Sequence, residues 1–355
     1  MSLRDRLIAE ISATGPISVA DYMLRCLHDP RNGYYATRPA LGAGGDFITA
    51  PLISQMFGEL IGLWCAEVWS RLGEPAQFRL VEAGPGDGTL MSDLLRAARL
   101  APGFIAGADL WLVETSRPLR ALQAEKLAGA PLTPRWADDL DQVPGGAPLI
   151  LASNELLDCL PARQFVRTGQ GWAERLVALD DDGALAFRLG PPAPAPTAAE
   201  IPLGVVFETS PVQQAFGSSL GERIARDGGA ALLIDYGRDA PGPGDTLQAL
   251  KDHQKVDPLA CPGEADLTVH ADFPAALAAA RQAGASTAPI LGQGKFLARL
   301  GIEQRAAALA AARPDRAEVI DRQLARLVEP DQMGTLFKAA CVHSQNLVPP
   351  GFEEA

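Results

Sequence analysis

The 355-residue chain is 47% hydrophobic and 21% charged, proportions that are ordinary for a soluble globular protein with one large or two modest domains. Its formal net charge of −12 argues against non-specific nucleic-acid binding, because an acidic protein without a concentrated basic face repels phosphates. A basic segment of a protein partner would be attracted instead. No apolar run approaches the roughly 20 residues that a bilayer-spanning helix needs, so membrane insertion is not expected.

The spacing of the cysteines and histidines indicates the compartment of the protein and whether it binds a metal. The five cysteines lie far apart, without a C-x-x-C pair, a pattern typical of the reducing cytosol. The first residues lead into a mixed helix with acidic side chains, which resembles neither a signal peptide nor a transit peptide. We therefore expect a cytoplasmic protein. The four histidines lack H-x-x-x-H spacing, so no metal site is expected.

The first quarter of the chain predicts helices. Residues 3–30 are expected to be helical, with Ser18 as the N-cap of a helix over 19–27. A helix from about 51 to 72 carries its apolar side chains on one face. Together, residues 1–75 are expected to form an N-terminal helical lid or cap. The segment Asp46-Phe47-Ile48-Thr49 is too polar and too glycine-flanked for a core, so we expect it to contribute to the lid.

From residue 78 the chain alternates predicted strands and helices, which favours a parallel sheet with helices on both faces. The predicted strands are 78–82, 109–114, 133–136, 149–153 and 230–236, and the predicted helices are 89–100, 118–127 and 211–226. Residues 76–355 would form this core, closed by an antiparallel edge strand over 335–342. An inserted antiparallel segment is expected over about 164–205, with an extended loop at 191–196. Another, largely helical segment over about 240–330 would lie on the substrate side.

The first predicted strand ends in an acidic residue followed by alternating glycines, Glu82-Ala83-Gly84-Pro85-Gly86-Asp87-Gly88. Glycine lets the backbone turn sharply and approach a ligand closely. A dinucleotide fingerprint would need a third glycine where Thr89 stands, and a phosphate-binding Walker loop would need a lysine after Gly88. Glu114, at the end of the second strand, is placed to accept hydrogen bonds from two ribose hydroxyls.

The pattern apolar-apolar-acidic-x-G-x-G-x-G resembles motif I of class I S-adenosylmethionine (SAM) methyltransferases. That resemblance implies an α/β fold with a Rossmann-like, doubly wound, mostly parallel sheet, and SAM as the cofactor. SAM would lie over Gly84, Gly86 and Gly88, with Glu82 at its amino group and Glu114 on its ribose. Trp136 and Asp138 would lie near the adenine. The alternative is that any strand–glycine–helix turn of an α/β protein could look like this.

The ends of two later strands carry candidate catalytic residues. Asn154, Glu155 and Asp158 follow the fourth strand, where a doubly wound sheet binds its ligands. Two carboxylates there suit a cationic acceptor such as a guanidinium group. Alternatively, Asn154 or Asp158 merely caps the next helix. Asp235, at the end of the following strand, could close the pocket or simply form a turn.

One further motif is judged accidental. Gly217-Ser218-Ser219-Leu220-Gly221 matches the G-x-S-x-G elbow of hydrolases. That elbow requires a strand immediately before the serine, whereas the residues on both sides here predict a helix.

Five blocks in order resemble one family, the mitochondrial complex I assembly factor methyltransferases and their bacterial MidA-like relatives. They are Gly45–Pro51 with Phe57-Gly58-Glu59, Glu82–Gly88, Ser153–Asp158 with Pro161, Asp235-Tyr236-Gly237, and Gly263–Thr268. The resemblance implies a SAM-dependent protein arginine methyltransferase with a protein substrate, in mitochondrial members a core complex I subunit. The family pattern leads us to expect an arginine and a tyrosine before the histidine that corresponds to His253. The segment 247–253 contains neither and so departs from that pattern. The alternatives are a non-catalytic, SAM-binding assembly chaperone and a small-molecule methyltransferase.

Overall fold

The structure is a computed structural model that describes residues 1–37 and 49–353. Within these residues the central sheet is made of β2 (Phe78–Ala83), β3 (Ala108–Val113), β4 (Arg135–Ala137), β5 (Leu149–Asn154), β10 (Gly229–Arg238), β14 (Ala271–Asp272), β15 (Ser286–Thr287), β16 (Leu291–Gly292) and β17 (Phe337–His343). Its main order is β15-β17-β10-β5-β2-β3-β4. Along this order, β10, β5, β2, β3 and β4 run parallel to one another, and β17 runs antiparallel to β10. The doubly wound, mostly parallel sheet expected from the sequence is confirmed.

The last strand differs from its prediction in one respect. β17 is antiparallel, as expected, but it is not an edge strand, because β15 and β16 pair with its free side. These strands have only two residues each, too short to produce a recognisable alternation of apolar and polar side chains.

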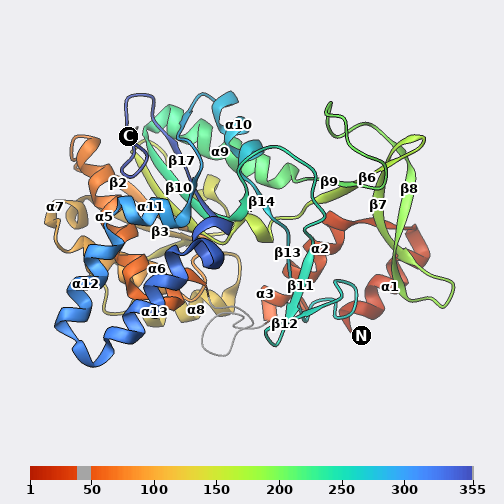
Figure 1. Ribbon diagram of the computed structural model, residues 1–355, viewed down its shortest axis with the longest axis horizontal. Helices are drawn as coiled ribbons and strands as arrows, with labels where there is room; N and C mark the ends of the chain where they lie inside the picture. The colour runs from red at the N-terminus through yellow and green to blue at the C-terminus, as the bar shows by residue number, and fades with distance from the viewer. Residues whose placement is uncertain (38–48, 354–355) are drawn as a thin grey trace.

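Both faces of the central sheet are covered by helices, because its strands alternate two sets of apolar side chains. On β10, Leu232 belongs to the cluster with α5 (Gln55–Arg71) and α6 (Thr89–Ala98), whereas Leu233 belongs to the cluster with α9 (Pro211–Asp227) and α10 (Phe273–Gln282). Figure 1 shows α9 and α10 above the sheet and α6 below it. The first face is also covered by α7 (Pro102–Gly107), α11 (Gln293–Arg299), α12 (Ile302–Ala312) and α13 (Ala317–Val328).

The single helix predicted over 51–72 is two helices in the structure. α4 (Ala50–Ile53) ends before Ser54, whose backbone is extended, and α5 begins at Gln55. The Ser54 hydroxyl accepts a hydrogen bond of 3.3 Å from the N–H of Met56, so it caps the second helix. The break turns α4 toward the carboxyl end of β5, where the N–H of Ala50 contacts Glu155.

The antiparallel insertion consists of β6 (Arg163–Thr168), β7 (Gly171–Leu179), β8 (Leu185–Ala193) and β9 (Val206–Thr209). β8 includes Pro191 and Pro192, which were expected in a loop. Among the strands that the structure describes, β8 pairs only with β7, and proline is tolerated at such an edge. Beside the insertion lies a small antiparallel sheet of β11 (Gln248–Lys251), β12 (Gln254–Val256) and β13 (Asp266–Thr268). These strands fall in the first part of the segment over about 240–330 that was expected to be largely helical, β12 and β13 within a stretch (251–272) expected to be a polar loop.

The first helices pack on these inserted strands and not on the central sheet (Figure 1). They are α1 (Leu3–Thr14), α2 (Val19–His28) and α3 (Tyr34–Thr37). The short strand β1 (Ile17–Ser18) pairs with β7, so the N-terminal segment is part of the inserted sheet. Ser18 caps α2 by accepting a hydrogen bond from Asp21, as predicted. Residues 1–75 therefore contribute to two separate apolar clusters.

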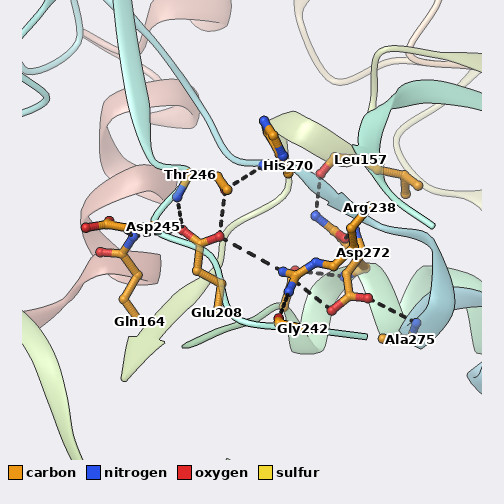
Figure 2. A network of polar contacts seen from close by, with 12 residues as sticks. Leu157, Gln164, Glu208, Arg238, Gly242, Asp245, Thr246, His270, Asp272 and Ala275 are labelled. Atoms are coloured by element: carbon orange, nitrogen blue, oxygen red, sulfur yellow. Dashed lines mark hydrogen bonds and ion pairs between the residues drawn. The ribbon is translucent and has the colours of Figure 1, made fainter. Parts of the chain in front are cut away.

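A buried polar network joins the insertion to the central sheet. Glu208 of β9 is 1% exposed and accepts hydrogen bonds from Gln164 Nε2 (2.8 Å), Thr246 N (2.9 Å) and Thr246 Oγ1 (2.6 Å). Figure 2 shows Arg238, at the end of β10, between Glu208 and Asp272; its guanidinium lies 4.0 Å and 3.6 Å from their carboxylates. The network fixes the inserted strands next to the carboxyl end of the parallel sheet.

The other helical segments are short connections and one further helix. They are α8 (Arg117–Lys126), the 3₁₀ turns Leu140–Gln142, Leu157–Cys159 and Pro314–Arg316, and a π-helical turn over Pro330–Gly334. Among the residues that the structure describes, no helix is long and apolar enough to cross a membrane.

Candidate active site

A cavity of about 450 Å³ opens at the carboxyl ends of β2, β3 and β5. Its lining includes the turn Gly84–Asp87, the strand-end residues Glu114 and Asn154, and side chains from α3 and α9. Parallel strands that end together at one edge place their following loops side by side. The structure therefore brings these loops together around one cavity.

The glycine turn after β2 has the backbone conformation for which glycine is suited. Gly84, Gly86 and Gly88 have φ values of +70°, +54° and +84°, which disfavour residues with a Cβ atom. A Cβ on Gly84 would come within 3.1 Å of Leu156 Cδ1, on the cavity wall. Gly88 does not line the cavity; a Cβ there would lie 3.3 Å from Gln123 Cα. Gly84 and Gly86 thus border the ligand space, while Gly88 lets α6 begin close to α8.

Glu82 is the residue before the end of β2, and its buried carboxylate lies at the cavity wall. Its side chain is 2% exposed, and Oε2 has no hydrogen-bond partner among the described residues. Burial, followed by the charges of Asp87 and Glu114, raises the pKa of Glu82 well above its ordinary value. A cationic group in the cavity would supply the missing partner and favour the charged carboxylate. These properties fit the amino group of SAM.

Glu114 follows β3 and is held in place by two donors. Its Oε1 accepts a hydrogen bond of 2.8 Å from Ser116 N, and its Oε2 accepts one of 3.3 Å from Gln123 Nε2. Burial raises the pKa of Glu114. The carboxylate lines the cavity, in a position compatible with the expected ribose hydroxyls.

Trp136 lies behind the cavity and does not line it. Its indole N–H donates a hydrogen bond of 2.8 Å to Gln123 Oε1, and Gln123 Nε2 donates one of 2.7 Å to the carbonyl of Gly86. The expected adenine contact is therefore replaced by a supporting role, because the indole points toward α8. Sequence reasoning missed Gln123. The signal was available, because Leu119, Gln123 and Leu127 follow one another at intervals of four residues, which places the polar Gln123 on the inner face of the helix.

Asp138 lines the cavity near the loop after β4, as expected. Its Oδ1 lies 2.6 Å from Arg120 Nη2, so part of its charge is already paired. Nearby lining residues that the sequence did not single out include Leu140 and, on α9, Ala215 and Phe216. The α9 residues face the cavity at helical spacing and give this end an apolar wall, which suits a purine ring.

At the end of β5, Asn154 and Glu155 form a fixed pair. Asn154 Nδ2 donates a hydrogen bond of 2.9 Å to Glu155 Oε1, which also accepts one of 3.2 Å from Ala50 N. Glu155 has a left-handed backbone, with φ of +54°, a conformation that is costly for a residue with a side chain and is concentrated at functional sites. Burial, followed by the charge of Asp158, raises the pKa of Glu155 to about 7.

Asp158 lines the cavity, whereas Asp235 lies behind it. Asp158 is 4% exposed, and its N–H donates a hydrogen bond of 3.1 Å to Asp235 Oδ2. Asp235 is 1% exposed and does not line the cavity. Burial raises the pKa of both carboxyl groups. Asp235 therefore holds the backbone of Asp158 from within β10, which continues to Arg238. Neither Asn154 nor Asp158 caps this turn.

The structure adds cavity residues from distant parts of the chain that sequence reasoning did not choose. They are His28 and Tyr35 from the N-terminal helices, and Asp266 from β13. Asp266 lies in the block Gly263–Thr268, which contributes to the family resemblance but for which the sequence predicts no role in the site. Asp46, Phe47 and Ile48, expected to contribute to a lid, lie outside the described residues; Thr49 lines the cavity.

The hydrolase-like motif is helical on both sides, as predicted. Ser219 lies inside α9, with no strand before it. The nucleophile elbow geometry is therefore missing at this position.

Comparisons with known proteins agree with this geometry. A family model described as "Putative S-adenosyl-L-methionine-dependent methyltransferase" matches residues 60–291. The chain is 38% identical to "Protein arginine methyltransferase NDUFAF7, mitochondrial" of Danio rerio over 95% of this chain and 86% of the relative. It is 39% identical to the Homo sapiens protein of the same name over 84% of this chain and 73% of the relative. A solved structure from Burkholderia thailandensis, bound to S-adenosyl-homocysteine, has a TM-score of 0.84 and 30% identity and covers 99% of this chain and 93% of that chain.

The cytoplasmic location expected from the cysteines is contradicted by these comparisons, because the curated relatives are named mitochondrial. Unpaired cysteines indicate reducing surroundings. They do not distinguish one reducing compartment from another.

Proposed function

The chain belongs to this family of S-adenosyl-L-methionine-dependent methyltransferases, and from that premise we propose that it methylates arginine side chains of a protein substrate. SAM is its methyl donor. The names of the relatives support arginine as the acceptor residue. Within this chain, the supporting observation is the charge of the cavity lining beside Asn154.

That lining is acidic at the acceptor end. Glu155 and Asp158 both face the cavity, and among the described lining residues there is no lysine or arginine. Such a surface attracts a cation and repels a carboxylate or phosphate acceptor. A guanidinium group is always protonated near neutral pH and presents several N–H donors to carboxylates. The acidic net charge of −12 also favours a basic segment of the protein substrate.

The cofactor residues are assigned from their chemistry. The Gly84–Gly86 turn would cradle SAM, Glu82 would hold its ammonium group, Glu114 its ribose hydroxyls, and Asp138 its adenine. Two observations support the fit: the partnerless Oε2 of buried Glu82 and the Gly84 backbone, on which a Cβ would meet Leu156. SAM supplies an electrophilic methyl group on a sulfonium.

The residues at the end of β5 act on the acceptor. Glu155 and Asp158 would orient the guanidinium so that one nitrogen points at the methyl group, which supplies the alignment that an in-line displacement requires. Asn154 holds Glu155 Oε1 in place, and Asp235 holds the backbone of Asp158. As the nitrogen–carbon bond forms and the carbon–sulfur bond breaks, the acceptor nitrogen gains positive charge. Glu155 can then accept the proton that this nitrogen releases.

We assign residues 76–355 to the catalytic core and the N-terminal helices to a cap. In support, Tyr35 and His28 line the same cavity as the core residues. We further propose, from the family resemblance, that the substrate is a subunit of a respiratory complex I-like enzyme. A basic arginine-containing segment of such a subunit would match the acidic cavity.

The test is transfer of a radiolabelled methyl group from SAM into a bacterial lysate, followed by acid hydrolysis and amino-acid analysis. We expect label in methylarginine. Label in lysine, in glutamine or in a small metabolite would contradict the arginine assignment. SAM binding without any transfer would instead support a non-catalytic chaperone.

A further inference from the structure

We propose that Asp266, held by the hydroxyl of Tyr35, is a further acceptor-binding carboxylate beside Glu155 and Asp158 and selects a guanidinium group over an ammonium group. The inference rests on the proposed function, because it names residues that would recognise the acceptor of that reaction. Asp266 and Tyr35 are separated by 231 residues in the sequence. The fold brings both to the cavity beside Asp158.

The Tyr35 hydroxyl lies within hydrogen-bond distance of both oxygens of the Asp266 carboxylate. It is 2.9 Å from Oδ1 and 3.0 Å from Oδ2. Burial, followed by the charge of Asp266, raises the pKa of Tyr35 well above its ordinary value, so the hydroxyl keeps its proton and remains a donor. Tyr35 can therefore hold a charged Asp266 in one orientation.

Neighbouring residues contact both the backbone carbonyl and the aromatic ring of Tyr35. Its carbonyl accepts a hydrogen bond of 2.7 Å from Ser116 Oγ, two residues beyond Glu114. Its ring stacks on His28, with centroids 6.0 Å apart. These contacts hold the tyrosine in place, and it acts on Asp266 as a positioning residue.

A continuous line of side chains connects Asp266 to the acceptor residues at the end of β5. The Tyr35 hydroxyl lies 3.0 Å from Cys159 Sγ, and Cys159 Sγ lies 3.2 Å from Asp158 Oδ1. The backbones are joined as well, because Val269 N donates a hydrogen bond of 2.9 Å to the carbonyl of Asp158. Asp158 and Asp266 are therefore held at a set separation, with a hydroxyl and a thiol between them.

An independent observation marks this end of the cavity as a ligand site. Asn154 is 9% exposed and lines the cavity. Its Oδ1 is buried and has no hydrogen-bond partner among the described residues. A buried amide oxygen without a donor carries a free-energy cost. An N–H group of the acceptor would remove that cost.

The arrangement favours a planar cation with donors on several sides. A guanidinium group has five N–H donors in a rigid plane and can meet two carboxylates and an amide oxygen at once. An ammonium group is a compact point charge with three donors and cannot span the same set without leaving one acceptor unpaired. Selectivity would therefore come from the separation of Asp158 and Asp266 and not from total charge.

The test uses two probes of equal charge, Nα-acetyl-L-argininamide and Nα-acetyl-L-lysinamide. Each is titrated by calorimetry into the full-length protein saturated with S-adenosyl-homocysteine. We expect the wild type to bind the arginine probe at least about tenfold more tightly than the lysine probe. Asp266→Asn should remove this preference, and Tyr35→Phe should reduce it by roughly three- to tenfold, with the dissociation constant of S-adenosyl-homocysteine unchanged within about twofold.

Two variants serve as matched controls. Asp182→Asn removes an exposed carboxylate at a hairpin tip, and Tyr22→Phe removes a buried hydroxyl that donates to Pro258 O, away from the cavity. Both should retain the preference for arginine. Circular dichroism and cofactor affinity report whether each variant folds, since a merely structural role of Tyr35 would weaken cofactor binding as well.

Equal binding of the two probes by the wild type, or an unchanged preference in Asp266→Asn, would overturn this inference. The methyl-transfer assay separates that failure from failure of the proposed function. Labelled methylarginine together with an unchanged preference in Asp266→Asn would contradict only the role of Asp266. Label on lysine or on a small metabolite would contradict the proposed function itself.

Discussion

The side-chain amide of Asn154 donates a hydrogen bond of 2.9 Å to Oε1 of Glu155, while Oδ1 of the same amide is buried without a partner among the described residues. The amide therefore orients the carboxylate through its N–H group and keeps an acceptor oxygen that no described residue pairs. Because Ala50 N also donates to Glu155 Oε1, the carboxylate is fixed before any ligand arrives.

Glu155→Gln should reduce methyl transfer without weakening SAM binding. The variant keeps the size of the side chain and removes its charge, so the lost interaction belongs to the acceptor and the transition state. A lost charge-assisted hydrogen bond of about 1.5–3 kcal/mol corresponds to a roughly 10- to 100-fold fall in kcat/KM. Steady-state kinetics and calorimetry with SAM measure the two quantities. A parallel loss of SAM affinity would make Glu155 a cofactor residue.

The stability of the cofactor-free protein should fall with rising pH through Glu155. Its pKa is 4.5 in the unfolded chain and about 7 in the folded protein, so the folded protein holds the proton over a range in which the unfolded chain has released it. The stabilising contribution is full below about pH 4.5 and is lost by about pH 7, an effect of about 3 kcal/mol at most. Urea unfolding between about pH 5 and pH 8 measures it. Glu155→Gln should show a weaker pH dependence, and identical curves for both proteins would refute the effect.

Glu82→Gln should weaken SAM while stabilising the protein at neutral pH. The change replaces a buried carboxyl group whose raised pKa disfavours folding at neutral pH and whose Oε2 has no partner among the described residues, but it also removes the anion that we assign to the SAM ammonium group. We expect a roughly 10- to 100-fold loss of SAM affinity by calorimetry and a higher melting temperature without SAM. Glu125→Gln, on the exposed face of α8, is the control. Unchanged SAM affinity would remove Glu82 from the cofactor site.

Glu114→Ala should also weaken SAM, since the ribose hydroxyls would lose a charged acceptor. A loss of about 1.5–3 kcal/mol, or roughly 10- to 100-fold in affinity, is expected. Fluorescence or calorimetric titration with SAM measures it, and circular dichroism checks that the variant is folded. An affinity change under about twofold would show that Glu114 does not contact the ribose.

Glu208→Ala should destabilise the protein without direct effect on the cavity, which Glu208 does not line. The truncation leaves Gln164 Nε2 and both donors of Thr246 without their buried acceptor, and it leaves Arg238 with one carboxylate partner fewer (Figure 2). Removing one partner of such a buried network costs about 3–5 kcal/mol. Urea unfolding should detect the loss, and a change below about 1 kcal/mol would mean that the network relaxes at little cost.

The sequence by itself determined the central sheet and the strand-end residues of the site. Each strand is a short apolar run, and its end is marked by a residue such as Glu82, Glu114 or Asn154. Because parallel strands end at one edge, position in the chain was enough to bring these residues together. The helical context of Ser219 was equally local, since it depends only on neighbouring residues.

Tertiary structure decided which of these side chains face the cavity. Trp136 lies within β4 and Asp235 within β10, and the first turns toward Gln123 while the second supports Asp158 from behind. Tyr35 and Asp266 meet across 231 residues through the packing of α3 and β13. Such contacts depend on how separate layers pack against one another, and periodicity along the chain carries no information about that geometry.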